Sequence, residues 1–498
     1  MKLSRLLETL LVKKVEGYQD FDVTGITHHT QKVQPGGIFA CLPGTQTHGI
    51  KFIQQALDKG ARAVLTDVEE VNVPGAVKVQ VPEVREALAV LSAKYFGSPS
   101  TRLRMVGVTG TNGKTTTSYL IQMLLEETGK KTGLIGTVQY KIGSQVLPVL
   151  ATTPEAPDLQ YILQQMADQG VSHVSMEVSS HALEWKRVSG CDFDIAVLTN
   201  VTEDHLDFHR TFEKYLGAKG KFFSRMGNLY EQSGKPRIAV LNTDDSNFLY
   251  FYDQTGVQKV TYGIKNPADV RARNIEIQDA GASFDVESPW GGGKINMKLT
   301  GMFNVYNVLA ALTVALAEGI DFETSKRILE KMPGVPGRFE KIDAGQDFTV
   351  IVDYAHTPDG LENVLRTVKE FAREKIITVF GCGGDRDRTK RAPMGEIAGS
   401  YSHYCILTTD NPRKEDPYKI CEEVEPGLLK RMDKEHYTIC IDRYAAISRA
   451  VEMAESGDVV VIAGKGHEDY QIFKDHTIHF DDRETARERI RVKLAGNS

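Results

Sequence analysis

The sequence predicts an α/β protein built from three domains, with mostly parallel sheets in the second and third. The chain has 498 residues, and compact domains usually hold roughly 100–200 residues. Runs of apolar, β-branched residues alternate with helical stretches, which is typical of strand–helix–strand units around a parallel sheet. A glycine-rich loop stands between one such strand and the helix after it.

Composition excludes several classes of protein. Apolar residues make up 41% of the chain and charged residues 25%, which is enough apolar material for several cores and excludes disorder as the main state. The net charge of −6 argues against non-specific nucleic-acid binding, so no nucleic-acid partner is expected. The six cysteines never form a CxxC pair, which favours reduced thiols over a zinc ribbon or a disulfide framework.

The N-terminal segment 1–17 is predicted to be an amphipathic helix rather than a signal peptide, because Arg5, Glu8 and Lys13 interrupt its apolar pieces. No run of 18 apolar residues occurs, so no membrane span is expected. The nearest approach, residues 305–320, contains polar residues and suits a buried helix better. These features predict a cytoplasmic protein.

The first hundred residues carry short elements. Strands are predicted over 21–23, 37–42 and 63–66, and helices over 52–60 and 84–96. The run Gly97-Ser98-Pro99-Ser100 punctuates the last helix. We therefore place the first domain at residues 1–101.

The second domain is predicted over residues 102–335. Its expected strands are 103–109, 171–178, 195–199 and 237–241, followed by an antiparallel patch at 260–300 and a helix at 304–318. The segment Met332-Pro333-Gly334-Val335-Pro336-Gly337 is the best linker in the chain. The third domain, 336–498, is predicted to alternate helices with strands. Those strands are 349–353, 376–380, 404–408 and 458–463.

The glycine loop is the strongest chemical signal. Lys114 and Thr115 follow Gly113 between a strand and a helix, where backbone amides and a helix N-terminus attract phosphate. The lysine can reach the β- and γ-phosphates and the threonine hydroxyl can join Mg²⁺. The loop is a variant, because Val108 stands where the general pattern has glycine. An ordinary strand–helix turn is the alternative.

Two further side chains follow predicted strands, where open α/β sheets bind ligands. Glu177 suits Mg²⁺ as an oxygen ligand, whereas the imidazole of His205 is less typical. The spacing of Glu177 and His205 does not decide between a metal site and ordinary polar residues at the ends of loops, and both alternatives stay equally open. Lys219, taken by itself, is predicted to be a solvated surface lysine.

A third constellation lies late in the chain. Residues 383–388 (GGDRDR), 410–413 (DNPR) and 464–468 (GKGHE) each follow a predicted strand. Arginine binds a carboxylate through two parallel hydrogen bonds, which fixes orientation as well as charge. The set suits a zwitterion with more than one carboxylate. Surface ion pairing is the alternative.

Ten motifs together resemble those of the Mur ligase family, in the order that the family shows. They are GTNGKTT (110–116), EVSSHAL (177–183), TNVTEDHLDFH (199–209), AKGKFF (218–223), GMFNVYN (301–307), PGRFE (336–340), VDYAHTPD (352–359), GGDRDRTKR (383–391), DNPRKEDP (410–417) and GKGHEDYQ (464–471). The resemblance is greatest to the branch that adds the third amino acid to UDP-N-acetylmuramoyl-L-alanyl-D-glutamate. The DNPR motif suggests diaminopimelate as that amino acid.

The resemblance implies a UDP-sugar-binding N-terminal domain, a central P-loop-like ATPase domain and a C-terminal Rossmann-like domain for the amino acid. In the implied reaction the D-glutamate γ-carboxylate attacks ATP, giving an acyl phosphate that the incoming amine then displaces. The implied cofactors are ATP, Mg²⁺ and a CO₂-derived carbamate on Lys219. The implied catalytic and metal set is Thr115, Glu177, His205 and Lys219, with Lys114 as a further catalytic residue.

The same resemblance carries over binding positions. ATP is expected at Gly110, Thr111, Asn112, Gly113, Lys114, Thr115, Thr116, Asn304, Arg338 and Asp353. The UDP-sugar-peptide is expected at Thr30, Thr152, Thr153, Ser179 and Arg187. Diaminopimelate is expected at Arg386, Asp410, Asn411, Pro412, Arg413, Gly464 and Glu468. L-Lysine lacks the distal carboxylate, so it would leave Arg413 unpaired, and we expect selection for meso-diaminopimelate.

The chain departs from the family pattern near the expected UDP-sugar-peptide site. His29-Thr30-Gln31 stands where Asp-Ser-Arg is usual, and Trp185 replaces a glutamine often found two residues before Arg187. Other readings are an L-lysine-adding relative, a folylpolyglutamate synthetase and a non-catalytic nucleotide-dependent regulator. Arg413 argues against the first, the DNPR motif and the three-domain length against the second. The joint presence of Lys114, Glu177, His205 and Lys219 argues against the third. A monomer is expected.

Overall fold

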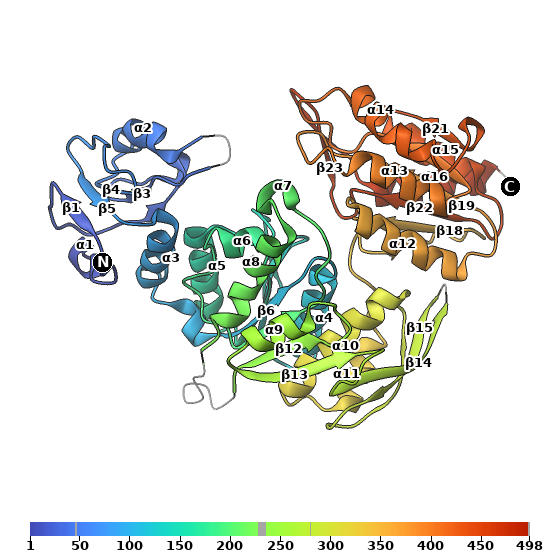
Figure 1. Ribbon diagram of the computed structural model, residues 1–498, viewed down its shortest axis with the longest axis horizontal. Helices are drawn as coiled ribbons and strands as arrows, with labels where there is room; N and C mark the ends of the chain where they lie inside the picture. The colour runs from blue at the N-terminus through green and yellow to red at the C-terminus, as the bar shows by residue number, and fades with distance from the viewer. Residues whose placement is uncertain (45–46, 228–235, 279, 497–498) are drawn as a thin grey trace.

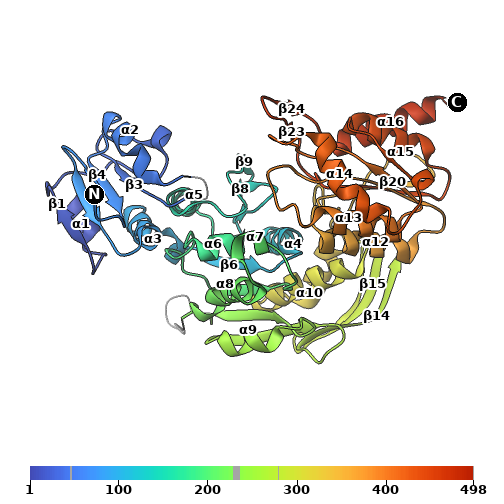
Figure 2. The same ribbon diagram turned by 45° about the horizontal axis from the view of Figure 1, so that its top comes forward.

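A computed structural model describes residues 1–44, 47–227, 236–278 and 280–496. Its strands form three large sheets, which follow one another along the chain and are covered by helices, and a small two-stranded hairpin. The unit around the second sheet lies between the other two (Figures 1 and 2). The predicted fold class, α/β with mostly parallel sheets, is confirmed.

The first sheet has the order β1-β5-β4-β3-β2. Its strands are β1 (Lys14–Glu16), β2 (Ile26–Thr27), β3 (Ile38–Ala40), β4 (Ala63–Thr66) and β5 (Val77–Gln80), and its helices are α1 (Leu3–Leu7), α2 (Ile53–Asp58) and α3 (Val84–Tyr95). The amphipathic helix predicted over 1–17 is wrong beyond Leu7. Residues 14–16 pair with β5 instead, and a strand edge offers them backbone partners that a frayed helix end lacks.

The second sheet runs β16-β15-β14-β13-β12-β11-β6-β10-β7-β8-β9. Its central strands are parallel and both ends are antiparallel, so the antiparallel patch predicted at 260–300 is confirmed. The strands are β6 (Arg104–Thr109), β7 (Thr132–Ile135), β8 (Tyr140–Ile142), β9 (Gln145–Leu147), β10 (His173–Glu177), β11 (Ile195–Leu198), β12 (Ile238–Asn242), β13 (Gln258–Gly263), β14 (Val270–Gln278), β15 (Gly281–Glu287) and β16 (Gly293–Met297).

Helices cover both faces of this sheet, which is why its central strands are apolar throughout. One core joins the sheet to α4 (Lys114–Glu126), α10 (Met302–Ala317) and α11 (Phe322–Leu329). The opposite core joins it to α5 (Ala156–Asp168), α6 (Ser180–Glu184), α8 (Phe212–Ser224) and α9 (Phe248–Gln254). The short α7 (Leu206–His209) precedes α8.

The third sheet has the order β17-β18-β22-β19-β20-β21. Its strands are β17 (Glu340–Lys341), β18 (Thr349–Asp353), β19 (Ile376–Phe380), β20 (Tyr404–Leu407), β21 (Tyr437–Ile439) and β22 (Val459–Ala463), and β23 (Tyr470–Ile472) pairs with β24 (Thr477–His479). One face packs on α12 (Pro358–Phe371), α13 (Arg391–Tyr401) and α14 (Pro417–Leu428), the other on α15 (Arg443–Met453) and α16 (Asp482–Gly496). None of the described helices is long and apolar enough to cross a membrane.

Candidate functional site

The glycine loop joins the end of β6 to the start of α4. Gly113 has φ +82° and Gly110 φ +149°, conformations that side chains rarely adopt. A Cβ on Gly113 would lie 2.3 Å from Asn307 Oδ1, so any other residue would have to displace that side chain as well as adopt this φ. The Lys114 ammonium donates to the carbonyls of Gly110 and Thr111 at 2.9 and 2.8 Å. The loop therefore carries a lysine folded over a helix N-terminus, as an anion-binding loop requires.

A buried carboxylate faces this loop from the next strand. Glu177 ends β10, which pairs with β6 in parallel, so both strands end at the same sheet edge. Its Oε1 accepts from the Thr137 amide at 2.7 Å. Its Oε2 accepts from the hydroxyls of Thr115 and Thr137, both at 3.1 Å. The predicted ligands Thr115 and Glu177 are thus in direct contact.

Lys219 is buried, so its isolated interpretation as a surface lysine is wrong. Only 1% of it is exposed, on the inner face of α8. Its Nζ donates to Gly110 O at 2.8 Å and lies 4.6 Å from the centre of the Tyr215 ring. Burial, and secondarily the charge of Lys114, holds the pKa of Lys219 well below its ordinary value. Lys219 therefore lies beside the glycine loop in surroundings that destabilise its charged ammonium form.

His205 lies near the same tyrosine ring as Lys219. Its ring packs 4.8 Å from that of His181 and 6.2 Å from that of Tyr215. Burial lowers the pKa of His205, while Asp204 opposes that shift. Within the described ranges no three His, Cys, Asp or Glu side chains converge as a metal cluster. Of the predicted set, Glu177 contacts Thr115 and Lys219 contacts Gly110 O, whereas His205 is connected to the loop through Tyr215, whose hydroxyl lies 2.9 Å from that of Thr111.

The predicted nucleotide residues beyond the loop sit where the second and third units meet. Arg338 donates to Thr115 Oγ1 at 3.1 Å and lies over the Tyr354 ring at 4.5 Å. Asn304 donates to Thr300 O and accepts from Asn307, at 2.9 and 3.1 Å. Arg338 thus reaches from the third unit's first residues to the loop in the second.

Asp353 ends β18, buried, and accepts from the Phe339 amide at 2.6 Å. Burial raises the pKa of Asp353 to about 6. The folded chain therefore binds this proton more tightly than the unfolded chain, whose carboxyl pKa is 3.8, so the contribution of Asp353 to stability falls as pH rises from about 4 to 6.

Replacing Asp353 by Asn tests this effect. We expect the difference in melting temperature, wild type minus Asp353→Asn, to fall as the pH rises from 4 to 6.5. Only the wild type must ionise a buried carboxyl group over this range. Thermal melts of both proteins across this range measure the difference. A difference that stays flat or rises would contradict the buried-carboxyl account.

Sequence reasoning missed a contact between the glycine loop and the third unit. Asp359, in the first turn of α12, accepts from the Thr202 hydroxyl at 3.1 Å and from the Asn112 side chain. Both donors lie in loops that follow strands of the second sheet. The VDYAHTPD motif contained this residue, but only the packing of the two units reveals its partner.

The predicted UDP-sugar-peptide residues of the second unit form one network. Thr153 Oγ1 donates to Glu177 O at 2.8 Å and accepts from the Ser179 amide at 3.1 Å. Arg187 donates to Thr153 O at 2.9 Å. The Thr152 hydroxyl lies 3.1 Å from that of Thr137. Thr30 sits apart from them, in a short 3₁₀ turn of the first unit.

The predicted amino-acid residues gather at the carboxyl edge of the third sheet. Asn411 donates to Glu468 at 2.8 Å, and the fully buried Lys465 contacts both residues, at 3.3 and 3.0 Å. A Cβ on Gly464 would lie 2.9 Å from Asp410 Oδ2. The sequence did not single out Lys465, although it lies within the GKGHE motif.

Arg413 stands at the rim of this group. It has φ +53°, and its Nη1 donates to the carbonyls of Gly384 and Asn411 at 2.9 and 3.3 Å. Pro412 precedes it. Arg386 is exposed and bonds only to its neighbour's carbonyl, Asp385 O, among the described residues. Burial lowers the pKa of Arg413, and Arg386 adds to the shift, so an added carboxylate would relieve an unfavourable charge.

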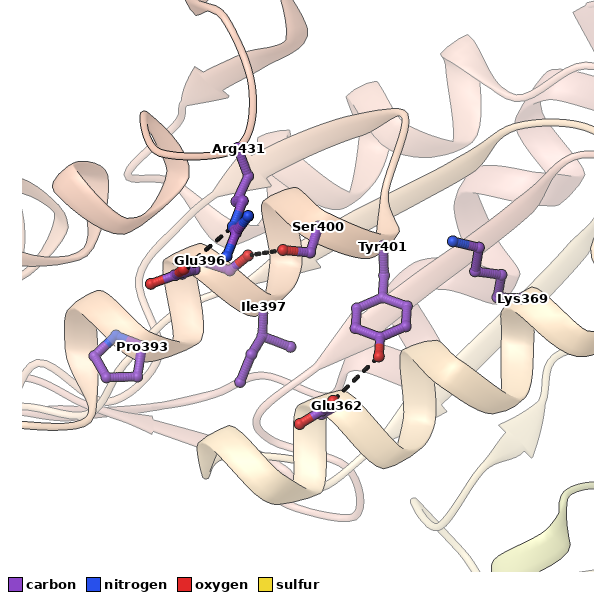
Figure 3. Close-up of a pocket in the computed structure, with 8 residues that line it drawn as sticks. All are labelled: Glu362, Lys369, Pro393, Glu396, Ile397, Ser400, Tyr401 and Arg431. Atoms are coloured by element: carbon purple, nitrogen blue, oxygen red, sulfur yellow. Dashed lines mark hydrogen bonds and ion pairs between the residues drawn. The ribbon is translucent and has the colours of Figure 1, made fainter.

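A hollow of about 490 Å³ lies between α12 and α13 (Figure 3). Its polar groups pair with one another: Tyr401 donates to Glu362 at 3.1 Å, and Arg431 to Glu396 at 2.7 Å. No predicted site residue lines it. It is separate from the candidate site.

Comparison with known proteins places the chain. The family described as Mur ligase family, catalytic domain, matches residues 22–96; Mur ligase middle domain matches 108–315; Mur ligase, glutamate ligase domain, matches 337–466. Two relatives named UDP-N-acetylmuramoyl-L-alanyl-D-glutamate--2,6-diaminopimelate ligase are 45% identical (Syntrophomonas wolfei subsp. wolfei) and 47% identical (Geobacillus thermodenitrificans). Each match covers 99% of this chain and 100% of the relative.

Solved structures agree. One of an enzyme with the same name is 35% identical, covers 98% of this chain and 99% of its own, and has a TM-score of 0.68. A MurF ligase from Thermotoga maritima in complex with ADP, 18% identical, shares the fold over 95% of this chain and 98% of its own, with a TM-score of 0.62. The site combines a strand-to-helix anion loop with a buried carboxylate, and the relatives match the chain over nearly its whole length. The protein is therefore a member of the Mur ligase family.

Proposed function

We propose that this chain is an ATP-dependent ligase that adds meso-2,6-diaminopimelate to UDP-N-acetylmuramoyl-L-alanyl-D-glutamate in peptidoglycan precursor synthesis. The observation that carries the proposal is the meeting of two sheet edges. The glycine loop with Glu177 ends one sheet, the Asp410–Arg413 and Gly464–Glu468 segments end the other, and Arg338 joins the two through Thr115. A site that must pass an activated carboxyl group to an amine needs this arrangement.

The reaction runs in two steps. An oxygen of the D-glutamate γ-carboxylate attacks the γ-phosphorus of ATP; a P–O bond forms, the bond to the β-phosphate oxygen breaks, and ADP leaves. The diaminopimelate amine then attacks the acyl carbon, an amide bond forms, phosphate leaves and the amine loses a proton. Lys114, the loop amides and Arg338 stabilise the negative charge that moves with the phosphoryl group.

The described residues fit Mg²⁺ as a cofactor. Thr115 Oγ1 and the Glu177 carboxylate, 3.1 Å apart, are the oxygen ligands that this cation prefers. His205 and Lys219 both lie near the Tyr215 ring, with 6.2 Å between the ring centres of His205 and Tyr215 and 4.6 Å from Lys219 Nζ to that ring centre, and His205 completes the proposed set. Bound Mg²⁺ neutralises phosphate charge. Thr137, through its amide and hydroxyl, holds the Glu177 carboxylate in one orientation.

Lys219 joins this set as a carbamate. The neutral amine attacks CO₂: a C–N bond forms, the electron pair of one C=O π bond moves onto oxygen, and the nitrogen loses one proton. The product is a carbamate, whose anionic oxygens can bind a cation. The charge of Lys114 repels an ammonium at this position, whereas it would attract an anion. The burial of Lys219, its contact with Gly110 O and its lowered pKa support this proposal.

We further propose how the substrates bind. Asn304, Arg338 and Asp353 hold ATP with the loop residues 110–116. Asp410, Asn411, Gly464 and Glu468 hold the amino-acid end of diaminopimelate, and Arg413 with Arg386 pairs its distal carboxylate. Thr30 with Thr152, Thr153, Ser179 and Arg187 holds the UDP-sugar-peptide. The proposed domains are 1–101, 102–335 and 336–498, acting in a monomer.

Phosphate release by the purified chain tests the function. With ATP, Mg²⁺ and UDP-N-acetylmuramoyl-L-alanyl-D-glutamate, we expect release with meso-diaminopimelate and little with L-lysine. Release with lysine alone would keep the ligase and discard the amino-acid assignment. ATP turnover that needs no sugar dipeptide would contradict the ligase and favour a nucleotide switch.

A further inference from the structure

An aromatic and ionic cluster joins the first unit to the second. The Trp185 ring lies under two guanidinium groups, with Arg85 Cζ at 4.7 Å and Arg187 Cζ at 4.9 Å from its centre. Glu155 pairs with both arginines, at 3.4 and 2.9 Å. The charged side chains are 10–18% exposed, so these contacts are much less screened than surface pairs.

The cluster connects the two halves of the proposed UDP-sugar-peptide site. Arg85, in the first turn of α3, donates to Pro43 O at 2.8 Å, in a loop of the first unit. Arg187 donates to Thr153 O, and Thr153 donates to Glu177 O. Trp185 therefore connects the first unit to Arg187, which is two hydrogen bonds from the backbone carbonyl of Glu177, the residue whose carboxylate faces the glycine loop.

The charges in the cluster do not cancel. One carboxylate faces two guanidinium groups, which leaves a net charge of +1 among these three side chains. An indole ring holds guanidinium groups through its π face without neutralising them. A glutamine at this position would offer hydrogen bonds but no such face. Trp185 also packs edge-on against Phe208, at 5.1 Å between ring centres, which restricts the orientation of the indole further.

We propose that Trp185 is a positioning residue that holds Arg187 and Arg85 for the free carboxylate of the substrate's D-glutamate, and so sets the affinity for the UDP-linked dipeptide. The inference rests on the proposed function. We assign the arginines to the D-glutamate carboxylate rather than to the diphosphate of the UDP group. The reason is that Arg187 bonds to Thr153, which bonds to Glu177, and the acyl group reacts next to Glu177. Glu155 keeps the two arginines in place, and the substrate carboxylate adds the second negative charge that the cluster lacks.

Fluorescence tests the contact without relying on catalysis. The chain has two tryptophans, and the second, Trp290, is 44% exposed on the turn between β15 and β16. In Trp290→Phe, emission reports Trp185 alone. We expect a saturable change with UDP-N-acetylmuramoyl-L-alanyl-D-glutamate and less than a tenth of it with UDP or UDP-N-acetylmuramoyl-L-alanine. An equal change with UDP, or no change with the full dipeptide, would overturn the assignment.

Kinetics test the positioning role. We expect Trp185→Gln to raise the KM for the UDP-dipeptide about tenfold, with kcat and the KM for diaminopimelate within about twofold, since two cation–π contacts are lost. Trp185→Phe keeps an aromatic face and should recover most of that loss. An unchanged KM, or an equal rise in the KM of all three substrates, would overturn the proposal. If the wild type binds the dipeptide but forms no product, the proposed function fails while the fluorescence result stands.

Discussion

Replacing Lys219 by Ala is expected to lower the rate of ligation by about 10²–10³-fold, the scale seen when one charge-stabilising group is removed from an active site. The side chain lies buried against the glycine loop, 2.8 Å from Gly110 O. Its proposed carbamate would supply an anionic oxygen beside the Thr115–Glu177 pair. Steady-state product formation at saturating substrates measures the loss.

Lys221 provides the matched control for this variant. It lies on the same helix, is 40% exposed and pairs with Glu184 at the surface. Lys221→Ala should keep the rate within about twofold, because exposed ion pairs contribute little. A small carboxylate such as acetate should restore part of the rate in Lys219→Ala by filling the vacated space. Full activity of Lys219→Ala without any additive would contradict the proposal that a carbamate on Lys219 takes part in the reaction.

Replacing Arg413 by Ala is expected to raise the KM for diaminopimelate and to weaken discrimination against L-lysine by about a hundredfold. A site built to pair a substrate group rejects the analogue lacking that group by as much as about 10⁴–10⁵. Among the described residues no carboxylate pairs with Arg413, whose Nη1 is held by two backbone carbonyls. The ratio of kcat/KM for the two amino acids measures the change.

The neighbouring Lys414 is exposed and serves as the control. Lys414→Ala should leave the selectivity ratio within about twofold. If the ratio were likewise unchanged in Arg413→Ala, Arg413 would not read the distal end of the amino acid, and Arg386 would become the residue to examine.

The parts of the site that depend on local sequence were predictable. A strand, a glycine loop and a helix over residues 103–127 follow from neighbouring residues alone, and the structure has β6 and α4 there. The four strands predicted in the third unit match β18, β19, β20 and β22 almost to the residue, because buried parallel strands are continuous apolar runs. The short strands β17, β21, β23 and β24 were not predicted. The helix over 1–17 failed because pairing with β5, about 65 residues away, competes with helix propensity.

Features that depend on packing between distant segments were not predictable. Nothing in the spacing of AKGKFF distinguishes Lys219, which is buried, from Lys221, which is exposed; the family resemblance alone singled it out. The contact of Asp359 with Thr202, 157 residues apart, and the gathering of Arg85 and Arg187 over Trp185 exist only once the units dock. Side-chain chemistry is local, whereas its partners are set by the tertiary fold.

The most direct test of the central claim follows one oxygen atom. If the D-glutamate γ-carboxylate attacks ATP, an oxygen of that carboxylate leaves with the phosphate when the amine displaces it. The experiment uses UDP-N-acetylmuramoyl-L-alanyl-D-glutamate labelled with ¹⁸O in the γ-carboxylate, together with the chain, ATP, Mg²⁺ and meso-diaminopimelate. The phosphate released should carry one ¹⁸O for each amide formed. Mass spectrometry of the phosphate measures this. Unlabelled phosphate, formed alongside product, would contradict the acyl-phosphate mechanism.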